Sequence, residues 1–532
     1  MGALTLKSFP FELRGWDIEK FESIDPTDGF GSNTRVYISK NKIVQVEPDY
    51  NSETFNTWLT DKGRQFFDGI FSKLYLEKNE KHSWLYLIKK LVKILYVYDH
   101  CNQQTYKKYF FTIVFENLSL EVLTILTIIS QNYSFIKLKR AENLKIKNDL
   151  ESTFQLNSSI NKIKLNSSTL CLLISTNPRY EGYYLNINLR QRFLKGNFKC
   201  LSIGSLINLT FPSKLLGSNL NTLKAIIEGN NLICQNIKSS KNPIVIINNE
   251  LFKRNDNNSI TTKALKILNH SIVFNKTWNS FNVLNPSLNE TGLKSTNKFS
   301  YLIKKDLNNF STLYFLNVNC NNIVNLKKII ESKLLNYFLI SKKLNQNSLF
   351  LNQNTINNNN NFFNNLNIFQ NNYHCLYSSM FYENEETFIS TDGLIKKTTK
   401  LISNNKTKNN WQILRKIFKN LKNNLMPFNK NNHNTLFFNS NKISNFQNFI
   451  YFQFYATKNL TNLNYHLNLK NNSFILNNFM GNFKLTNSKL VNTKLKYWLD
   501  DFFSGGKDEY SQNSLTMTSC SMILRVNSTN FF

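Results

Sequence analysis

The chain has 532 residues, of which 41% are hydrophobic, so it can bury several cores and is not disordered by composition. Its formal net charge of +31 would suit a nucleic-acid-binding protein, but the lysines are spread along the chain without a long basic run or a basic–aromatic repeat. Asn, Lys, Ile, Leu and Phe are abundant, as A+T-rich codons would also make them, so the charge does not decide the function.

The cysteines and histidines are scattered along the chain. No two cysteines are close enough to form a C-x-x-C pair or another spacing typical of zinc or iron–sulfur ligands. His374 and Cys375 are adjacent, but neighbouring side chains on a strand point to opposite faces, so we interpret them as structural. Free thiols that are mostly buried are typical of a reducing compartment.

The first elements in chain order are short strands and turns in residues 1–70. Residues 35–39 and 42–46 flank Lys40-Asn41 and predict a β-hairpin. The most apolar stretch that follows, residues 84–98, is too short for a membrane span and is interrupted by three lysines. Its pattern predicts an amphipathic helix that buries one face.

From residue 110 onward, short apolar runs alternate with helical stretches. The apolar runs predict buried strands at 110–115, 169–174, 198–203 and 243–247, and the stretches between them predict helices at 118–129, 184–194 and 220–228. Strands that alternate with helices indicate a doubly wound parallel sheet. Residues 341–375, 404–410 and 429–441 are rich in Asn and predict extended loops or insertions.

Residues 21–69 resemble the first module of the molybdopterin (Mo/W bis-guanine-dinucleotide) oxidoreductases. In that family the pattern C-x2-C-x3-C, a hairpin, a long gap and a fourth Cys before K-G-R hold a [4Fe–4S] cluster. The matching positions here are Ile24, Thr27, Gly31 and Thr60, while Lys62-Gly63-Arg64 is retained. Thiolates hold the iron of such clusters, and none of these four residues supplies one. The resemblance therefore implies a degenerate module that binds no cluster and no metal.

A second resemblance lies in Asn177, Pro178 and Arg179, which follow the apolar run 170–174. A strand, a sharp turn and a helix place backbone N–H groups at the carboxyl end of the strand, where α/β sheets usually receive a phosphate or dinucleotide. In molybdopterin enzymes a similar G-x-N-P-x-E turn lies beside the guanine dinucleotide. We interpret the turn here as a structural relic and expect no cofactor in it.

Two later segments extend the same resemblance. Residues 194–205 look like the next helix end and strand, and residues 383–399 with 411–421 resemble the stretch E-x3-T-[FY]-x-N-x-[DE]-G-R followed by a tryptophan-led helix. Ser390 and Leu394 replace the Asn and Arg of that motif, which argues against cofactor binding. Glu385-Glu386 and Asp500-Asp501 are interpreted as solvated charges or partner contacts rather than acid–base pairs. Gly29, Gly31 and Gly63 are interpreted as turn glycines.

Within this superfamily, the sequence looks most like the largest (75 kDa-type) peripheral-arm subunits of respiratory complex I. Residues 2–16 look like the opening GALTSKPYxFxxRPW segment of their molybdopterin-like part, and residues 501–521 look like their closing DFYxTDxIxRxSxTMAxCS segment. The fold class implied is α/β and molybdopterin oxidoreductase-like, with a small N-terminal β-rich degenerate Fe–S module followed by doubly wound α/β domains. The expected division is 1–70 (module), 71–340 (α/β domains), 341–441 (Asn-rich insertions with remaining α/β segments) and 442–532 (C-terminal segment and tail).

The resemblance implies an accessory, structural role in the peripheral arm of NADH:ubiquinone oxidoreductase, with no catalytic site and no redox centre on this chain. The family's Cys-rich front half is expected on a separate ferredoxin-like polypeptide, which would be the main partner beside other complex I subunits. The expected location is the matrix side of the mitochondrial inner membrane, with no membrane span, and the gene is expected to be organellar. The alternatives are an active Mo/W oxidoreductase and a basic nucleic-acid-binding protein.

Overall fold

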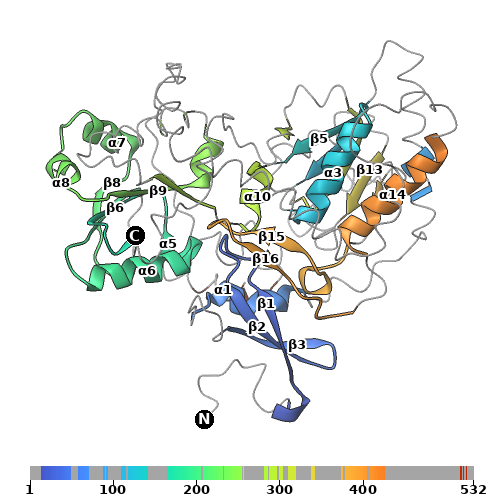
Figure 1. Ribbon diagram of the computed structural model, residues 1–532, viewed down its shortest axis with the longest axis horizontal. Coiled ribbons are helices and arrows are strands. Elements are labelled where there is room, and N and C mark those ends of the chain that lie inside the picture. Colours follow the sequence, from blue (N-terminus) through green and yellow to red (C-terminus); the bar gives the residue numbers. More distant parts are fainter. Residues whose placement is uncertain are drawn as a thin grey trace, which may run out of the picture.

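Figure 1 presents the computed structural model of the chain. It describes residues 13–49, 58–70, 88–89, 91–93, 110–115, 118–141, 165–204, 208–231, 233–254, 256, 260, 281–285, 287–295, 299–302, 310–318, 337–341, 373–375, 378–403, 408–425, 514, 516–517, 519 and 523. Within these residues, every helix is too short or too polar to cross a membrane.

The N-terminal module is a three-stranded antiparallel sheet in the order β1 (Glu19–Ile24), β2 (Asn33–Ser39) and β3 (Lys42–Pro48). The predicted hairpin is confirmed: Lys40 and Asn41 have φ angles of 47° and 63°, as a two-residue turn between twisted strands requires. Two short helices follow, α1 (Asp61–Gln65) and the 3₁₀ helix η3 (Phe66–Ile70), and Val36 and Val46 share a core with Phe66 and Phe67 of η3.

The second body is a five-stranded sheet whose neighbouring strands are all parallel. The side chains of β6 alternate between its two faces: Leu172 joins a core with the helices α7 and α8, while Cys171 and Leu173 join a core with α6. The sheet is therefore covered on both sides. Its strand order is β10 (Phe281–Leu284), β9 (Ile244–Asn248), β6 (Leu170–Ile174), β7 (Lys199–Ile203) and β8 (Lys214–Gly217), and its helices are α5 (Pro178–Glu181), α6 (Tyr183–Leu194), α7 (Leu220–Ile227) and α8 (Cys234–Lys238).

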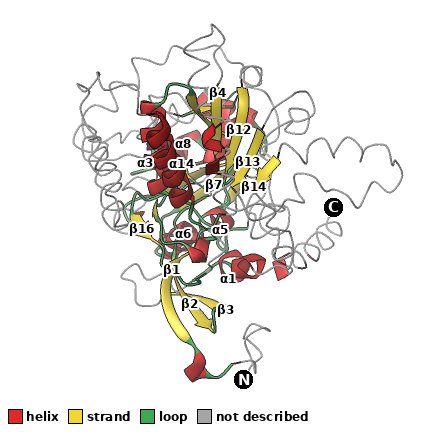
Figure 2. Ribbon diagram, turned by 90° about the vertical axis from the view of Figure 1, so that its right-hand side faces the viewer, coloured by secondary structure: helices red, strands yellow, loops and turns green. Residues whose placement is uncertain are grey.

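The third body is a six-stranded sheet, also parallel throughout. Its helices α3 (Leu120–Asn132) and α14 (Asn410–Leu425) lie side by side against it, as Figure 2 shows. Ile88, Leu91 and Val92 belong to the same core, whereas Lys89 and Lys93 are exposed, so the amphipathic helix predicted at 84–98 is confirmed where it is described. The strand order is β11 (Ser300–Tyr301), β5 (Ile136–Arg140), β4 (Phe110–Phe115), β12 (Phe310–Leu316), β13 (Tyr337–Ser341) and β14 (Tyr373–Cys375).

The alternation of strands and helices predicted parallel sheets in doubly wound α/β domains but not how the strands divide, and they form two parallel sheets. The whole five-stranded sheet is inserted between β5 and β11 of the six-stranded one. Periodicity along a chain identifies strands but does not determine which strands pair, so it could not separate the two sheets.

A two-stranded hairpin, β15 (Thr387–Ile389) and β16 (Ile395–Lys397), follows the 3₁₀ helix η11 (Phe381–Glu383). It lies in the middle of the molecule, where the module and both sheets converge (Figure 1). Near the C-terminus, the hydroxyl groups of Ser514 and Thr516 donate to Asp68 Oδ2 at 2.8 and 3.1 Å, and Met517 is buried. The closing segment therefore contacts the N-terminal module.

Candidate functional site

The four degenerate cluster positions lie around the loop that joins β1 to β2. Ile24 is buried against Leu288 and Phe388. A Cβ atom on Gly31 would lie 3.8 Å from Ile24 Cδ1 but only 2.7 Å from Leu288 Cδ1, and Gly31 has a φ of +55°, so the loop has no room for a side chain there. The structure thus brings Ile24 and Gly31 together and fills the space between them with hydrocarbon.

The side chains at the other two positions, Thr27 and Thr60, make local hydrogen bonds. The Thr27 hydroxyl and backbone N–H both donate to Asp25 Oδ1, at 2.6 and 2.8 Å. Thr60 caps α1 by accepting from the Gly63 N–H at 3.0 Å, and a Cβ on Gly63 would lie 2.1 Å from Asp25 Oδ2. Gly63 therefore permits close packing inside a helix, and its interpretation as a turn glycine is wrong. The side chains at all four positions offer no sulfur and do not fit a [4Fe–4S] cluster.

The interior of the same loop holds charges that the sequence reading did not single out. Asp28 is buried, and its carboxylate accepts from the Gly31 N–H at 2.7 Å and the Ser32 hydroxyl at 3.3 Å. Burial, and then the negative charge of Asp25, raise its pKa to about 7, while Lys396 opposes the shift. Lys396 donates to Gly31 O at 2.8 Å, and burial lowers its pKa. The one available signal was the run DPTDG between the first degenerate positions.

The predicted nucleotide turn lies at the carboxyl end of β6, where the strand order of the five-stranded sheet reverses between β6 and β9. The Asn177 N–H donates to Glu181 Oε2 at 3.0 Å, and Glu181 Oε1 accepts from Asn248 Nδ2, at the end of β9, at 2.7 Å. Pro178 is buried at the start of α5, while Arg179 extends to Asn208 O at 3.4 Å. The Asn177 N–H group, to which a phosphate at this edge of the sheet would bind, therefore already donates to the Glu181 carboxylate.

The β15–β16 hairpin connects the module to the edge of the five-stranded sheet. Thr391 donates twice to Gly29 O, from its N–H at 2.7 Å and its hydroxyl at 2.8 Å, and its hydroxyl also lies 3.4 Å from Asn285 O. A Cβ on Gly29 would lie 1.9 Å from Asn285 O, so glycine is needed for this close approach. Next to it, Phe30 packs edge-on against Tyr184 at 5.6 Å between ring centroids.

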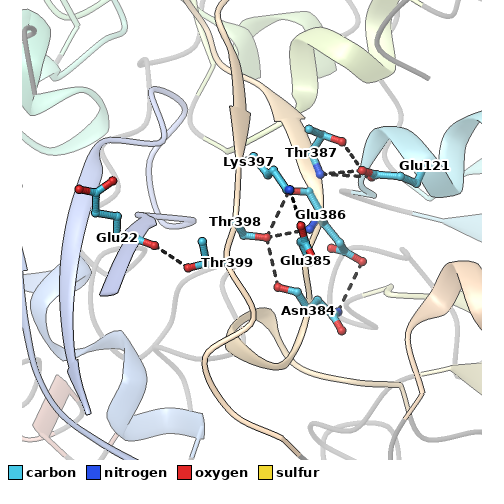
Figure 3. Close-up of polar contacts among 9 residues, drawn as sticks. All are labelled: Glu22, Glu121, Asn384, Glu385, Glu386, Thr387, Lys397, Thr398 and Thr399. Atoms are coloured by element: carbon cyan, nitrogen blue, oxygen red, sulfur yellow. Dashed lines mark hydrogen bonds and ion pairs between the residues drawn. The ribbon is translucent and has the colours of Figure 1, made fainter. Parts of the chain in front are cut away.

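The hairpin also connects the module to the six-stranded sheet, as Figure 3 shows. The Thr387 N–H donates to Glu121, at the start of α3, with distances of 2.9 and 3.2 Å to its two carboxylate oxygens, and the Thr387 hydroxyl bonds the same carboxylate. On the other side, the Thr399 hydroxyl donates to the carbonyl of Glu22 in β1. One hairpin thus holds all three bodies through backbone and side-chain hydrogen bonds.

Of the two acidic pairs interpreted as solvated charges or partner contacts, Asp500-Asp501 lies outside the described residues, and solvation is wrong for Glu386. Glu385 is half-exposed and pairs with Lys397, but Glu386 is only 8% exposed. Burial, and then the negative charge of Glu121, raise the pKa of Glu386 to about 8. Two buried carboxyl groups, Glu121 and Glu386, therefore lie where the hairpin meets α3.

The comparisons with known proteins agree with this architecture. Residues 95–420 match the family described as molybdopterin oxidoreductase, and residues 18–68 match the family described as NADH-ubiquinone oxidoreductase NDSU1/NuoG-like, 4Fe-4S domain. The first match spans more than half of the chain, so the chain belongs to the molybdopterin oxidoreductase family. The predicted resemblance and fold class are confirmed.

Two curated relatives are subunits of one enzyme. The chain is 27% identical over 348 residues to the NADH-ubiquinone oxidoreductase 75 kDa subunit of Reclinomonas americana, covering 62% of this chain and 50% of that protein. It is 28% identical over 306 residues to the mitochondrial 78 kDa subunit of the same oxidoreductase from Neurospora crassa, covering 55% and 40%. The chain thus spans half or less of these relatives' length.

Among solved structures, a formyltransferase/hydrolase complex from Methylorubrum extorquens is similar with a TM-score of 0.43 and 9% identity, covering 65% of this chain and 98% of that one.

Proposed function

We propose that this chain is a structural part of the peripheral arm of NADH:ubiquinone oxidoreductase (complex I) that carries no redox centre of its own. The observation that supports this best is the degenerate module. Its sheet and K-G-R helix are retained, while Ile24, Thr27, Gly31 and Thr60 are used for packing, local hydrogen bonds and a helix cap. A family match to a 4Fe-4S domain at residues 18–68 therefore coexists with a donor set that cannot hold iron.

The relic turn supports the same proposal from a second site. Asn177, Pro178 and Arg179 follow a strand at the switch point of a parallel sheet, but the Glu181 carboxylate bonds the turn's N–H group and would repel a phosphate. We therefore infer that the turn holds no guanine dinucleotide. The loss of cofactor contacts at both sites, with the surrounding fold intact, favours a role in assembly over one in catalysis.

The proposed role follows from the way the β15–β16 hairpin joins the module and the two sheets. The β15–β16 hairpin bonds Gly29 in the module, Glu121 in α3 and the edge of the five-stranded sheet, so the three bodies present a fixed surface. Such a surface can pack against a cluster-bearing neighbour and exclude water from it, which tunes an Fe–S potential without supplying a ligand. We infer that electron transfer from NADH to quinone is supported in this way.

The partner is proposed to be a separate Cys-rich, ferredoxin-like polypeptide, together with other peripheral-arm subunits, on the matrix side of the mitochondrial inner membrane. The A+T-rich composition supports an organellar gene. The test is affinity purification of the full chain from its native source, followed by native electrophoresis and mass spectrometry. We expect a large assembly with NADH dehydrogenase activity that contains a Cys-rich polypeptide. A chain that purifies as a lone monomer, or with nucleic acid, would overturn the proposal.

A further inference from the structure

Lys396 is a half-buried lysine that reaches from the hairpin to the loop of the degenerate module. Its ammonium group donates to Gly31 O at 2.8 Å and lies 3.4 Å from Oδ1, the side-chain oxygen of Asn33. Asn33 is the first residue of β2 and lies 363 positions earlier in the chain than Lys396. The fold thus sets a primary amine beside the side-chain amide of a distant segment.

The strand that carries Lys396 is fixed to the module on both sides of that lysine. Before it, Thr391 donates to Gly29 O from its N–H at 2.7 Å and from its hydroxyl at 2.8 Å. After it, the Thr399 hydroxyl donates to the carbonyl of Glu22 in β1 (Figure 3). Because both anchors lie on the module, the amine and the amide are held next to each other, which lowers the barrier to a reaction between them.

Hydrocarbon packs around the same loop. A Cβ atom on Gly31 would lie 2.7 Å from Leu288 Cδ1 and 3.7 Å from Lys396 Cδ, so the lysine stem lies against the glycine. Ile24 and Phe388 are buried against Leu288 as well. Such packing limits the access of water, which would otherwise favour the charged form of the amine.

Asp28 supplies an acid in the same loop. The charges of Asp28 and Lys396 each shift the pKa of the other group, so the two side chains face each other. Burial favours the uncharged form of both: together with the negative charge of Asp25 it raises the pKa of Asp28 to about 7, and it lowers the pKa of Lys396 although Asp392 and Asp28 oppose this. The loop therefore favours an unprotonated amine beside a protonated carboxyl group.

We propose that Lys396 and Asn33 form an intramolecular isopeptide bond, which joins the hairpin covalently to the module. An unprotonated amine is a nucleophile, so Nζ attacks the side-chain Cγ of Asn33, the carbon bonded to the Oδ1 atom that Lys396 reaches. The carboxyl group of Asp28 gives its proton to the amide and then takes up the proton that Nζ loses. The Cγ–Nδ2 bond breaks, and Nδ2 leaves as ammonia. One C–N bond forms and one breaks, so the step needs no oxidant or reductant.

The bond gives the module a cross-link that its degenerate positions do not supply. A cluster cross-links the side chains that bind it, and those thiolates are missing here. The amide between Asn33 and Lys396 joins the module to the hairpin instead, and closing so long a loop restricts the unfolded chain. This inference goes beyond the proposed function and does not depend on it, because it concerns bonding within one chain.

The experiment is mass spectrometry of the full-length chain purified under denaturing conditions, which an amide bond survives. We expect an intact mass lower by one ammonia than the sequence gives, and a tryptic digest with a branched peptide that joins Asn33 to Lys396. Trypsin should not cut after Lys396 in these molecules, because its amine has become an amide. Lys396→Arg should abolish the bond and keep the charge. Lys397→Arg is the matched control and should keep the bond, because Lys397 is the exposed neighbour that pairs with Glu385.

The variant Asp28→Asn tests the proposed acid. It keeps the shape of the side chain but removes the transferable proton, and should lower the cross-linked fraction about tenfold or more. A chain of full mass, cut after Lys396 and without a branched peptide, would overturn the inference, and this result needs no variant to fold. Loss of ammonia without a branched peptide would overturn it too, because an asparagine can lose ammonia alone. A cross-link from Lys396 to Asp28 with loss of water would refute Asn33 as the partner.

Discussion

The carboxyl group of Glu386 is buried inside the hairpin junction and should make the protein less stable as pH rises. It is 8% exposed, and the carboxylate of Glu121 repels its charged form. Its pKa rises from the ordinary 4.5 to about 8, first because burial penalises the charged form and then because Glu121 repels a second negative charge. The substitution Glu386→Gln replaces the protonated acid with a neutral group of the same shape.

The direction in which stability changes with pH follows from the number of protons that the folded and unfolded states bind. Between pH 4.5 and about 8 the folded protein keeps the proton on Glu386, while the unfolded chain has released it. The folded state thus binds more protons, so the contribution of this group is fully present below pH 4.5 and is lost as pH rises through about 8. Each unit of pKa shift corresponds to about 1.4 kcal/mol, so the loss across the window is at most about 5 kcal/mol.

The assay is urea denaturation of the full-length chain at a series of pH values, followed by tryptophan fluorescence and circular dichroism. We expect the urea midpoint of the natural chain to fall between about pH 5 and pH 8, and that of Glu386→Gln to fall less, so that the variant is the more stable protein at the alkaline end. The matched control is Glu385→Gln, because Glu385 is the half-exposed neighbour that pairs with Lys397. Parallel pH profiles for the natural chain and Glu386→Gln would refute the reasoning.

Three further substitutions test the junction and the degenerate module. Gly29→Ala places a methyl group 1.9 Å from Asn285 O and should lower the free energy of unfolding, measured by urea denaturation, by about 2 kcal/mol or more. The control Gly15→Ala, where a Cβ atom would meet nothing within 4 Å, should leave it unchanged. Equal effects of the two substitutions would contradict the close approach of Gly29 to Asn285. Thr391→Val removes the hydroxyl bond to Gly29 O but keeps the side chain's size, and should cost about 1 kcal/mol; no change in midpoint would mean the bond is unimportant. Cysteines introduced at positions 24, 27, 31 and 60 should still not give a stoichiometric cluster on reconstitution, because Leu288 leaves no room for a side chain at position 31. Absorption and iron content measure the cluster, and a full cluster would contradict this geometry.

The elements of the fold could be predicted largely from the sequence, because they depend on local patterns. The run 110–115 is the strand β4 without any shift in its bounds, and Lys40-Asn41 forms the turn that its residue types favour. The pairing of the strands could not be predicted, because β4 has β12, nearly 200 residues later, as its neighbour. Nothing in the local pattern of either strand determines such a partner.

The candidate site was predicted in part. The positions Ile24, Thr27, Gly31 and Thr60 could be aligned from the resemblance to the family's cluster module, and the fold does gather them around one loop. Asp25 and Asp28 were missed because acidic residues usually lie on the surface, and only tertiary packing reveals that these two are buried. Glu386 was misread for the same reason: its burial depends on α3, which lies more than 250 residues earlier in the chain.

The central claim, that this chain keeps a cofactor-binding fold without the cofactors, is tested most directly by a metal count on the chain itself. The native assembly is purified, its polypeptides are separated under mild anaerobic conditions, and iron, acid-labile sulfide, molybdenum and tungsten are measured for each. We predict substoichiometric amounts of all four on this chain, with the iron and sulfide on a Cys-rich partner. About four iron and four sulfide per chain, or one molybdenum or tungsten, would contradict the account.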